Sequence, residues 1–218
     1  MTTGVFGMQD PATTANEYNA LVFVIRQLLG RVQTVSLVRV EKCSNSGGVT
    51  PVGTVDMTVL ANLMTGNRQP VPHGILTNRP YLRVQGGANA VIIDPQPGDL
   101  GLAVFCSRDS SAVIAAKGPA NPGSFRQFDW ADGLYLGGVL NGTPEQYVQM
   151  SAAGISIVSP TQITLQAPTV NIQASSSVTI NSPANTIEGG GTSIDGKPFL
   201  PHHHGGVQTG GSNTGGVT

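Results

Sequence analysis

The segment from Ser151 to Ile187 constrains this chain most, because it contains no charged residue and repeats itself at a short period. Each block carries β-branched or leucine side chains two positions apart and ends in Ser-Pro, Ala-Pro, Ala-Ser or glycine. A period of seven to nine residues predicts a stack of short strands joined by turns. The apolar positions are Ile155/Ile157, Ile163/Leu165, Val170/Ile172, Val178/Ile180 and Ile187.

Blocks of this kind cannot close a hydrophobic core within one chain. Each strand presents two apolar side chains on one face, while the other face carries Thr, Gln, Asn and Ser. The favoured solution is a trimeric β-helix, in which three intertwined chains turn their apolar faces toward a common axis. A β-solenoid built by a single chain is the competing solution, but it usually needs longer coils. We therefore expect a homotrimer.

The region from Arg31 to about Tyr135 shows a different pattern of short apolar runs separated by clusters of Gly, Pro, Asn and Ser. Runs of this type, without interleaved helices, predict a small antiparallel barrel or sandwich, and a five-stranded OB-like barrel is the simplest choice. The stretch FDWADGLYLGG is expected to mark the passage from barrel to rod. The runs are VQTVSLVRVEK, VGTVDMTVLANL, YLRVQ, NAVIIDP, GLAVFCSRD and SAVIAA.

The residues before the barrel predict a helix. Thr13 or Thr14 is the expected N-cap and Gly30 the expected C-terminal stop. The helix is so apolar that it needs a partner surface, either the next domain or another chain. Its apolar residues at helical spacing are Tyr18, Leu21, Val22, Ile25, Leu28 and Leu29.

These patterns predict a mainly β fold in four parts. Residues 1–30 form an N-terminal arm and helix, and residues 31–136 form the OB-like barrel. Residues 137–192 form the intertwined trimeric β-helix, and residues 193–218 form an apex with a metal site.

The charge content supports assembly and argues against a nucleic-acid partner. Only 11% of the residues are charged and the net charge is −1, whereas an average soluble domain has about 25% charged residues. An exposed surface normally needs charge for solubility, so this composition fits a chain that buries much of its surface in an oligomer. The basic groove and interleaved aromatic side chains that single-stranded nucleic acid requires are missing from the pattern.

Neither cysteine pattern nor N-terminus indicates an exported or membrane-spanning chain. Cys43 and Cys106 do not form a CxxC motif, and we expect free thiols, with a disulfide as the alternative. The start MTTGVFGMQDP lacks the basic and apolar regions of a signal peptide. The apolar run Ala20–Ile25 is far too short to span a bilayer.

Three consecutive histidines stand near the C-terminus in the stretch PHHHGG. In an extended segment His202 and His204 share one face and His203 points away. Three chains on an axis would bring six imidazoles together, and six nitrogens suit an octahedral transition metal: iron first, with nickel, cobalt or zinc as alternatives. A remnant of an expression tag and a polar tail without metal are the competing interpretations.

The remaining polar residues do not form a recognisable catalytic set, so we do not expect an enzyme. No His or GxSxG motif accompanies Ser110 and Ser111. The chain also lacks the paired carboxylates of a glycosidase. Asp94 and Asp99 bracket a turn and are expected to cap backbone amides. The other polar residues are assigned to loops or isolated positions, with Asp195 either in a turn or beside a liganding histidine: His73, Glu145, Glu188 and Asp195.

Two stretches resemble the central spike, or membrane-piercing tip, proteins of contractile-tailed bacteriophages. They are QPGDLGLAVFCSRD (Gln96–Asp109) and, more specifically, DGKPFLPHHHGGVQTGGSNTGG from Asp195 onward. The resemblance covers most of the chain and implies a homotrimer with one iron ion per trimer, held by His202 and His204 while His203 is not a ligand. With only about five blocks, the needle is short for this family.

The resemblance also implies a place and a task. The barrel would dock onto the tail hub in the baseplate, and the tip would breach the bacterial outer membrane. The protein would be made in the host cytoplasm and carried at the tail tip of the virion. The alternatives are a trimeric receptor-binding tail fibre and the spike of a related bacterial contractile injection system.

Overall fold

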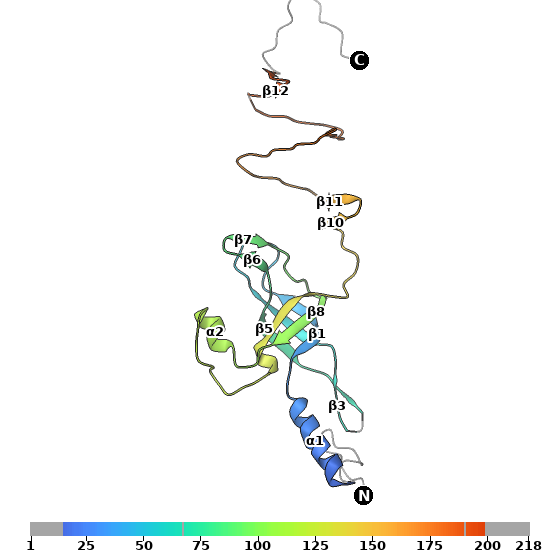
Figure 1. Ribbon diagram of the computed structural model, residues 1–218, viewed down its shortest axis with the longest axis vertical. Helices are drawn as coiled ribbons and strands as arrows, with labels where there is room; N and C mark the ends of the chain where they lie inside the picture. Colours follow the sequence, from blue (N-terminus) through green and yellow to red (C-terminus); the bar gives the residue numbers. More distant parts are fainter. Residues whose placement is uncertain (1–14, 67, 190, 199–218) are drawn as a thin grey trace, which may run out of the picture. The chain divides into compact units, whose positions relative to one another are not determined.

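The computed structural model describes residues 15–66, 68–189 and 191–198. The chain divides into two compact units, Met1–Pro160 and Thr161–Thr218, and each is described by itself below. The described residues form a mainly β structure, which confirms the predicted fold class at that level (Figure 1).

The first unit is built on a five-stranded antiparallel sheet with the order β5-β2-β1-β8-β9. The sheet curls into a half-barrel, as Figure 1 shows, and its two edge strands approach each other. A parallel bridge joins Tyr81 to Tyr135, and the Leu82 N–H donates to the Tyr135 carbonyl at 2.7 Å. The strands are β1 (Val35–Cys43), β2 (Thr54–Val59), β5 (Ile75–Pro80), β8 (Leu100–Phe105) and β9 (Gly133–Gly138).

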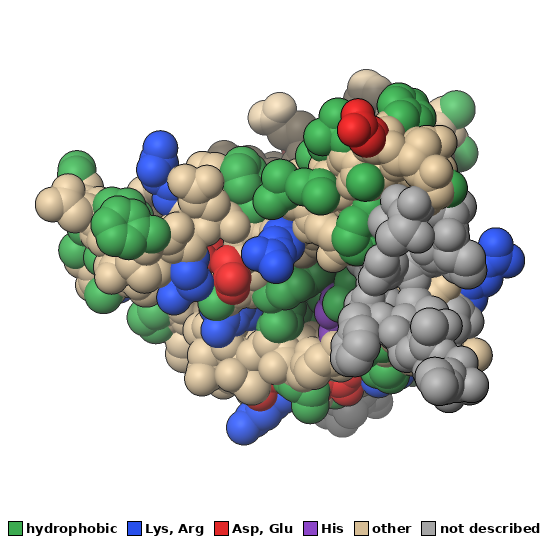
Figure 2. All heavy atoms as spheres, turned by 90° about the horizontal axis from the view of Figure 1, so that it is seen from below, with side chains coloured by type: hydrophobic (Ala, Val, Ile, Leu, Met, Phe, Trp, Pro, Cys, Tyr) green, Lys and Arg blue, Asp and Glu red, His purple; other side chains and the backbone are tan. Residues whose placement is uncertain are grey.

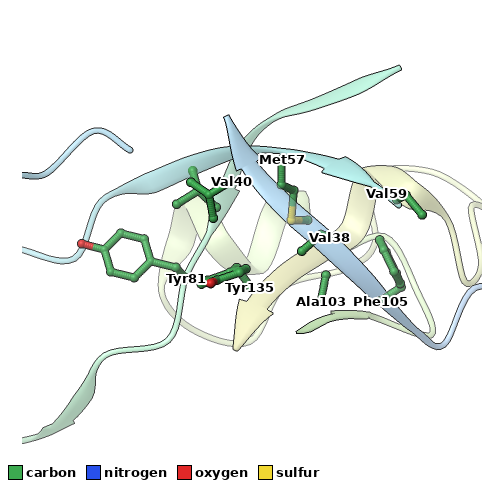
Figure 3. Close-up of a cluster of buried hydrophobic side chains, with 9 residues drawn as sticks. Val38, Val40, Met57, Val59, Tyr81, Ala103, Phe105 and Tyr135 are labelled. Carbon is green, nitrogen blue, oxygen red and sulfur yellow. The ribbon is translucent and has the colours of Figure 1, made fainter. Parts of the chain in front are cut away.

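Alternation along these strands decides which side chains fill the half-barrel. In β1, Val38 and Val40 are buried while Val35 and Leu37 are exposed, because successive strand residues point to opposite faces. Figure 3 shows the buried set gathered within the curled sheet. The core consists of Val38, Val40, Val55, Met57, Val59, Tyr81, Ala103, Phe105 and Tyr135.

Two short hairpins extend the loops between the sheet strands. One pairs β3 (Leu63–Met64) with β4 (Pro70–Val71), and the other pairs β6 (Val84–Gly86) with β7 (Asn89–Val91). Register shifts interrupt the β1–β2, β2–β5 and β8–β9 pairings. Bulges of this kind bend and twist a strand, which helps a narrow sheet to curl.

One prediction for the barrel region is wrong. The run SAVIAA forms a short helix, α2 (Ser111–Ala116), rather than a strand; alanine favours helix, and the run has no strand partner in the sheet. The stretch FDWADGLYLGG, expected to mark the passage from barrel to rod, contains the 3-10 helix η1 (Trp130–Asp132) and β9, the last strand of the sheet, which the sequence patterns did not indicate.

The predicted N-terminal helix is confirmed as α1 (Glu17–Leu29). Its N-cap is Asn16, and not Thr13 or Thr14 as predicted. Asn16 has an extended backbone, and its Oδ1 accepts the Asn19 N–H at 2.8 Å, which satisfies a backbone donor of the first turn. Gly30 ends the helix as expected, and its N–H donates to the Arg26 carbonyl at 2.8 Å.

The rest of the described chain contains little regular structure. A hairpin of β10 (Tyr147–Ser151) and β11 (Gly154–Val158) completes the first unit. In the second unit the described residues form one small hairpin, β12 (Ser193–Ile194) with β13 (Lys197–Pro198). None of the described helices is long and apolar enough to cross a membrane.

The packing around Gly101 provides a test of how β8 and β9 pack in the curled sheet. A Cβ at this position would overlap the Tyr135 ring and the Gly137 carbonyl. We expect Gly101→Ala to lower the free energy of unfolding by about 1–3 kcal/mol, the usual cost of overpacking. Gly74→Ala is the matched control, because a Cβ there meets no atom within 4 Å. Equal urea-unfolding midpoints for the two variants would contradict this packing.

Candidate functional site

The repeat segment leaves its apolar side chains uncovered within the described chain. Relative exposures run from 52% at Ile163 to 77% at Ile187, in positions where a globular domain would bury such residues. Exposed hydrophobic side chains also appear elsewhere, as the face in Figure 2 shows. The exposed side chains of the repeat in the second unit are Ile163, Leu165, Val170, Ile172, Val178, Ile180 and Ile187.

The described backbone groups of the same segment do not pair with one another either. Among the described residues, the stretch from Ile163 to Gly189 contains no strand and no hydrogen bond between two of its backbone groups. The strands predicted after the first block of the repeat are therefore not formed by this single chain. Extended backbone has strong hydrogen-bonding groups at every residue, so it forms stable strands only beside a neighbour.

The first block of the repeat does find a partner, in a segment that the sequence analysis missed. In the β10–β11 hairpin, Val148 lies opposite Ile157 and Met150 lies opposite Ile155. Residues directly opposite each other in an antiparallel pair share a face. All four side chains are exposed by at least 56%, so this ribbon presents one apolar face to the solvent. The alternation in Tyr147–Ser151 is the sequence signal that could have revealed β10.

The predicted metal ligands His202 and His204, and the bystander His203, lie outside the described residues, so the metal site stays a prediction. The hairpin before them is described. Asp195 and Gly196 form its two-residue turn with φ values of 52° and 72°, the left-handed conformation that Asp-Gly turns adopt. Of the two roles considered for Asp195, the turn role is the one that this geometry supports.

No other metal site emerges within residues 15–66, 68–189 and 191–198, where no group of three or more His, Cys, Asp or Glu could hold an ion. His73 is a loop residue, as predicted; its Nε2 lies 3.0 Å from the Ala61 carbonyl oxygen and its ring meets Trp130 edge-on. Cys43 and Cys106 are unpaired in the structure, in agreement with the expected free thiols.

A buried ion pair, also missed at the sequence level, fixes the loops at one edge of the sheet. Arg83 donates to Asp94 at 2.5 Å, and both side chains are almost fully buried. Asp94 also accepts from the Tyr81 hydroxyl at 2.6 Å and the Gly47 N–H at 2.8 Å. Burial alone would raise the pKa of Asp94, but these hydrogen bonds outweigh it and hold the pKa below its ordinary value.

The predicted capping roles of Asp94 and Asp99 are thus confirmed, with an addition. Asp99 caps the Gln96 N–H at 2.8 Å. Asp94 caps Gly47 but also neutralises Arg83, whose partner could not be identified from sequence because the contact depends on the folding of the sheet.

A second charged cluster surrounds α2. Arg126 contacts Asp109 at 2.9 Å and Asp132 at 3.2 Å, and both carboxylates are buried. Asp109 accepts hydroxyl hydrogens from Ser111 at 2.5 Å and Ser124 at 2.6 Å. These hydrogen bonds lower the pKa of Asp109 from 3.8 to about 2. Each buried carboxylate of the cluster therefore has hydrogen-bond partners, and the cluster fixes the loop between α2 and η1. Ser111 acts in it as a hydrogen-bond donor.

A comparison with protein-family models and with curated proteins gave no match for this chain.

The lowered pKa of Asp109 predicts acid sensitivity. A carboxylate whose pKa is depressed on folding stabilises the native state above its ordinary pKa, and that contribution is lost as the pH falls from about 4 to about 2. At pH 5, Asp109→Asn should have a lower melting temperature than the wild type. Between pH 5 and pH 2.5, the melting temperature of Asp109→Asn should fall by less than that of the wild type. The exposed Glu145→Gln should keep the wild-type pH dependence. An equal fall in melting temperature for Asp109→Asn and the wild type between pH 5 and pH 2.5 would contradict this prediction.

Proposed function

We propose that this chain is the central spike of a contractile phage tail, a homotrimeric piercing device without enzymatic activity. The observation that carries the proposal is the repeat segment from Ile163 to Gly189, whose apolar side chains are exposed and whose described backbone groups find no partner among themselves. Such a segment needs other chains to become a folded structure.

Three copies of the segment satisfy both requirements together. Each chain provides strand edges for its neighbours, and the Ile, Val and Leu faces meet at the axis. Full burial of one such side chain is worth about 1.5–3 kcal/mol, so a few blocks suffice to hold the chains together. The same pairing leaves no open strand edge along the rod, which prevents pairing with unrelated chains.

The barrel supports the same assignment. The order β5-β2-β1-β8-β9, with a parallel approach between Tyr81 and Tyr135, is consistent with the five-stranded Greek-key barrel of the OB type expected from the resemblance. In the proposed assembly the barrel docks onto the tail hub in the baseplate.

The chemistry of the predicted apex fits a transition metal. His202 and His204 supply two imidazoles per chain, and three chains supply six nitrogens, which suits octahedral iron at one ion per trimer. The described residues at the start of the apex form a tight Asp-Gly hairpin. When bound, the ion ties three chain ends together, and six protein ligands leave no open position for a substrate, so its role is structural.

The mechanism is mechanical. Contraction of the tail sheath drives the spike against the bacterial outer membrane, and the load falls on the tip. Intertwined strands transmit the load because no chain can unfold without breaking its pairing with two others. A metal at the end prevents fraying where chain ends usually open first.

The metal and the mass of the assembly test the proposal most directly. The full-length protein should be a trimer of 22.4 kDa chains with one iron per three chains, measured by light scattering and metal analysis. His202→Ala with His204→Ala should remove the iron and leave the trimer, whereas His203→Ala should keep both. A monomeric protein, or a protein with one metal ion per chain, would contradict the proposal.

The apolar faces of the repeat can be tested with a matched pair. Ile172→Thr places a hydroxyl at the predicted axis and should lower the melting temperature of the trimer, since it removes a buried aliphatic group. Gln173→Thr introduces the same residue one position later, on the predicted outer face, and should leave the melting temperature nearly unchanged. Equal effects of the two substitutions would argue against an alternating, axis-facing strand.

A further inference from the structure

Helix α1 carries an apolar seam that nothing in the described chain covers. Tyr18, Leu21, Ile25 and Leu28 are exposed by 73%, 59%, 45% and 60%, and no residue of the helix is buried. Their spacing of three, four and three residues is the a/d pattern of a coiled coil. The first unit contains the barrel, yet the barrel does not cover this seam.

The flanks of the seam are apolar as well. Val22 and Leu29 occupy e positions and Val24 occupies a g position, where two-stranded coiled coils usually carry charges. The apolar surface is therefore wider than one facing helix can cover. The charged residues of the helix, Glu17 and Arg26, lie at its first turn and at a b position, away from the centre of the seam.

The helix also needs packing in order to exist. It has 13 residues, and isolated helices of that length are marginal in water. Its C-terminal end is fastened to the barrel, because the Gln33 N–H donates to the Phe128 carbonyl at 3.0 Å and the Gln33 side chain donates to the Gly30 carbonyl at 3.1 Å. The C-terminal end of α1 is thus held by the barrel, while the apolar side chains of its seam stay uncovered by the described residues. Exposed apolar side chains continue past the helix at Val32 and Val35.

We propose that α1 is a second self-association element, in which three copies of the helix pack seam to seam as a parallel three-stranded coiled coil. A heptad pattern is complementary to a copy of itself, and the seam carries no charged group that would select a different partner. The parallel direction follows because each helix continues directly into its own barrel. The number three rests on the proposed trimer, but the contact itself is separate from the repeat and the apex.

Cysteine cross-linking in the full-length chain tests the contact. In a Cys43→Ser, Cys106→Ser background, Leu28→Cys places a thiol at a d position, and Ala20→Cys places one at an outward c position of the same helix. After mild oxidation, Leu28→Cys should give at least tenfold more covalent dimer on denaturing gels than Ala20→Cys. A thiol at the axis of three helices links two chains and leaves the third free.

A second pair of variants, made in the chain that keeps Cys43 and Cys106, tests the contact even if the cysteine variants do not fold. Ile25→Gln should lower the melting temperature, whereas Ala20→Gln, on the outward face, should not. If the protein is a trimer by light scattering and both pairs behave alike, the coiled coil is overturned, another occupant such as a hub protein covers α1, and the proposed spike stands. If the protein is a monomer, the coiled coil and the proposed spike are both overturned.

Discussion

An extended backbone must find hydrogen-bond partners, and this requirement governs the repeat segment after its first block. Between Ile163 and Gly189 the described backbone groups do not pair with one another, and the alternate Ile, Val and Leu side chains stand in solvent. Two apolar residues per block are few for a core built by one chain. In the proposed spike, association of three chains removes both deficits at once.

The half-barrel differs from the repeat because one chain supplies its whole hydrophobic core. Its curled sheet brings Tyr81 and Tyr135 together at the two edges, and the core fills the space between them. Two buried charge clusters then fix the loops: Asp94 holds Arg83, and Arg126 joins Asp109 to Asp132. Charged side chains are buried here only where each has a partner, as the cost of an unpaired buried charge demands.

The sequence predicted the elements whose signal is local. Gly30 stops α1, and β1, β2 and β8 follow from β-branched runs bounded by turns. It failed where long-range pairing decides: SAVIAA became a helix because no strand partner exists for it, and β9 became a strand because β8 pairs with it. The contact between Arg83 and Asp94 was equally invisible, because it depends on how the loops fold back on the sheet.

By itself the sequence determined that the repeat from Ser151 to Ile187 carries no charge and only one or two regularly spaced apolar side chains per block, because periodicity and composition are properties of the chain and do not depend on its folding. It also predicted that His202 and His204 share a face in an extended segment, since strand geometry has a period of two. Only the tertiary structure decided which apolar surfaces the chain covers for itself. Among the described residues, it covers the inner face of the half-barrel and leaves the seam of α1 and one face of the β10–β11 hairpin open, because burial depends on which segments meet in space.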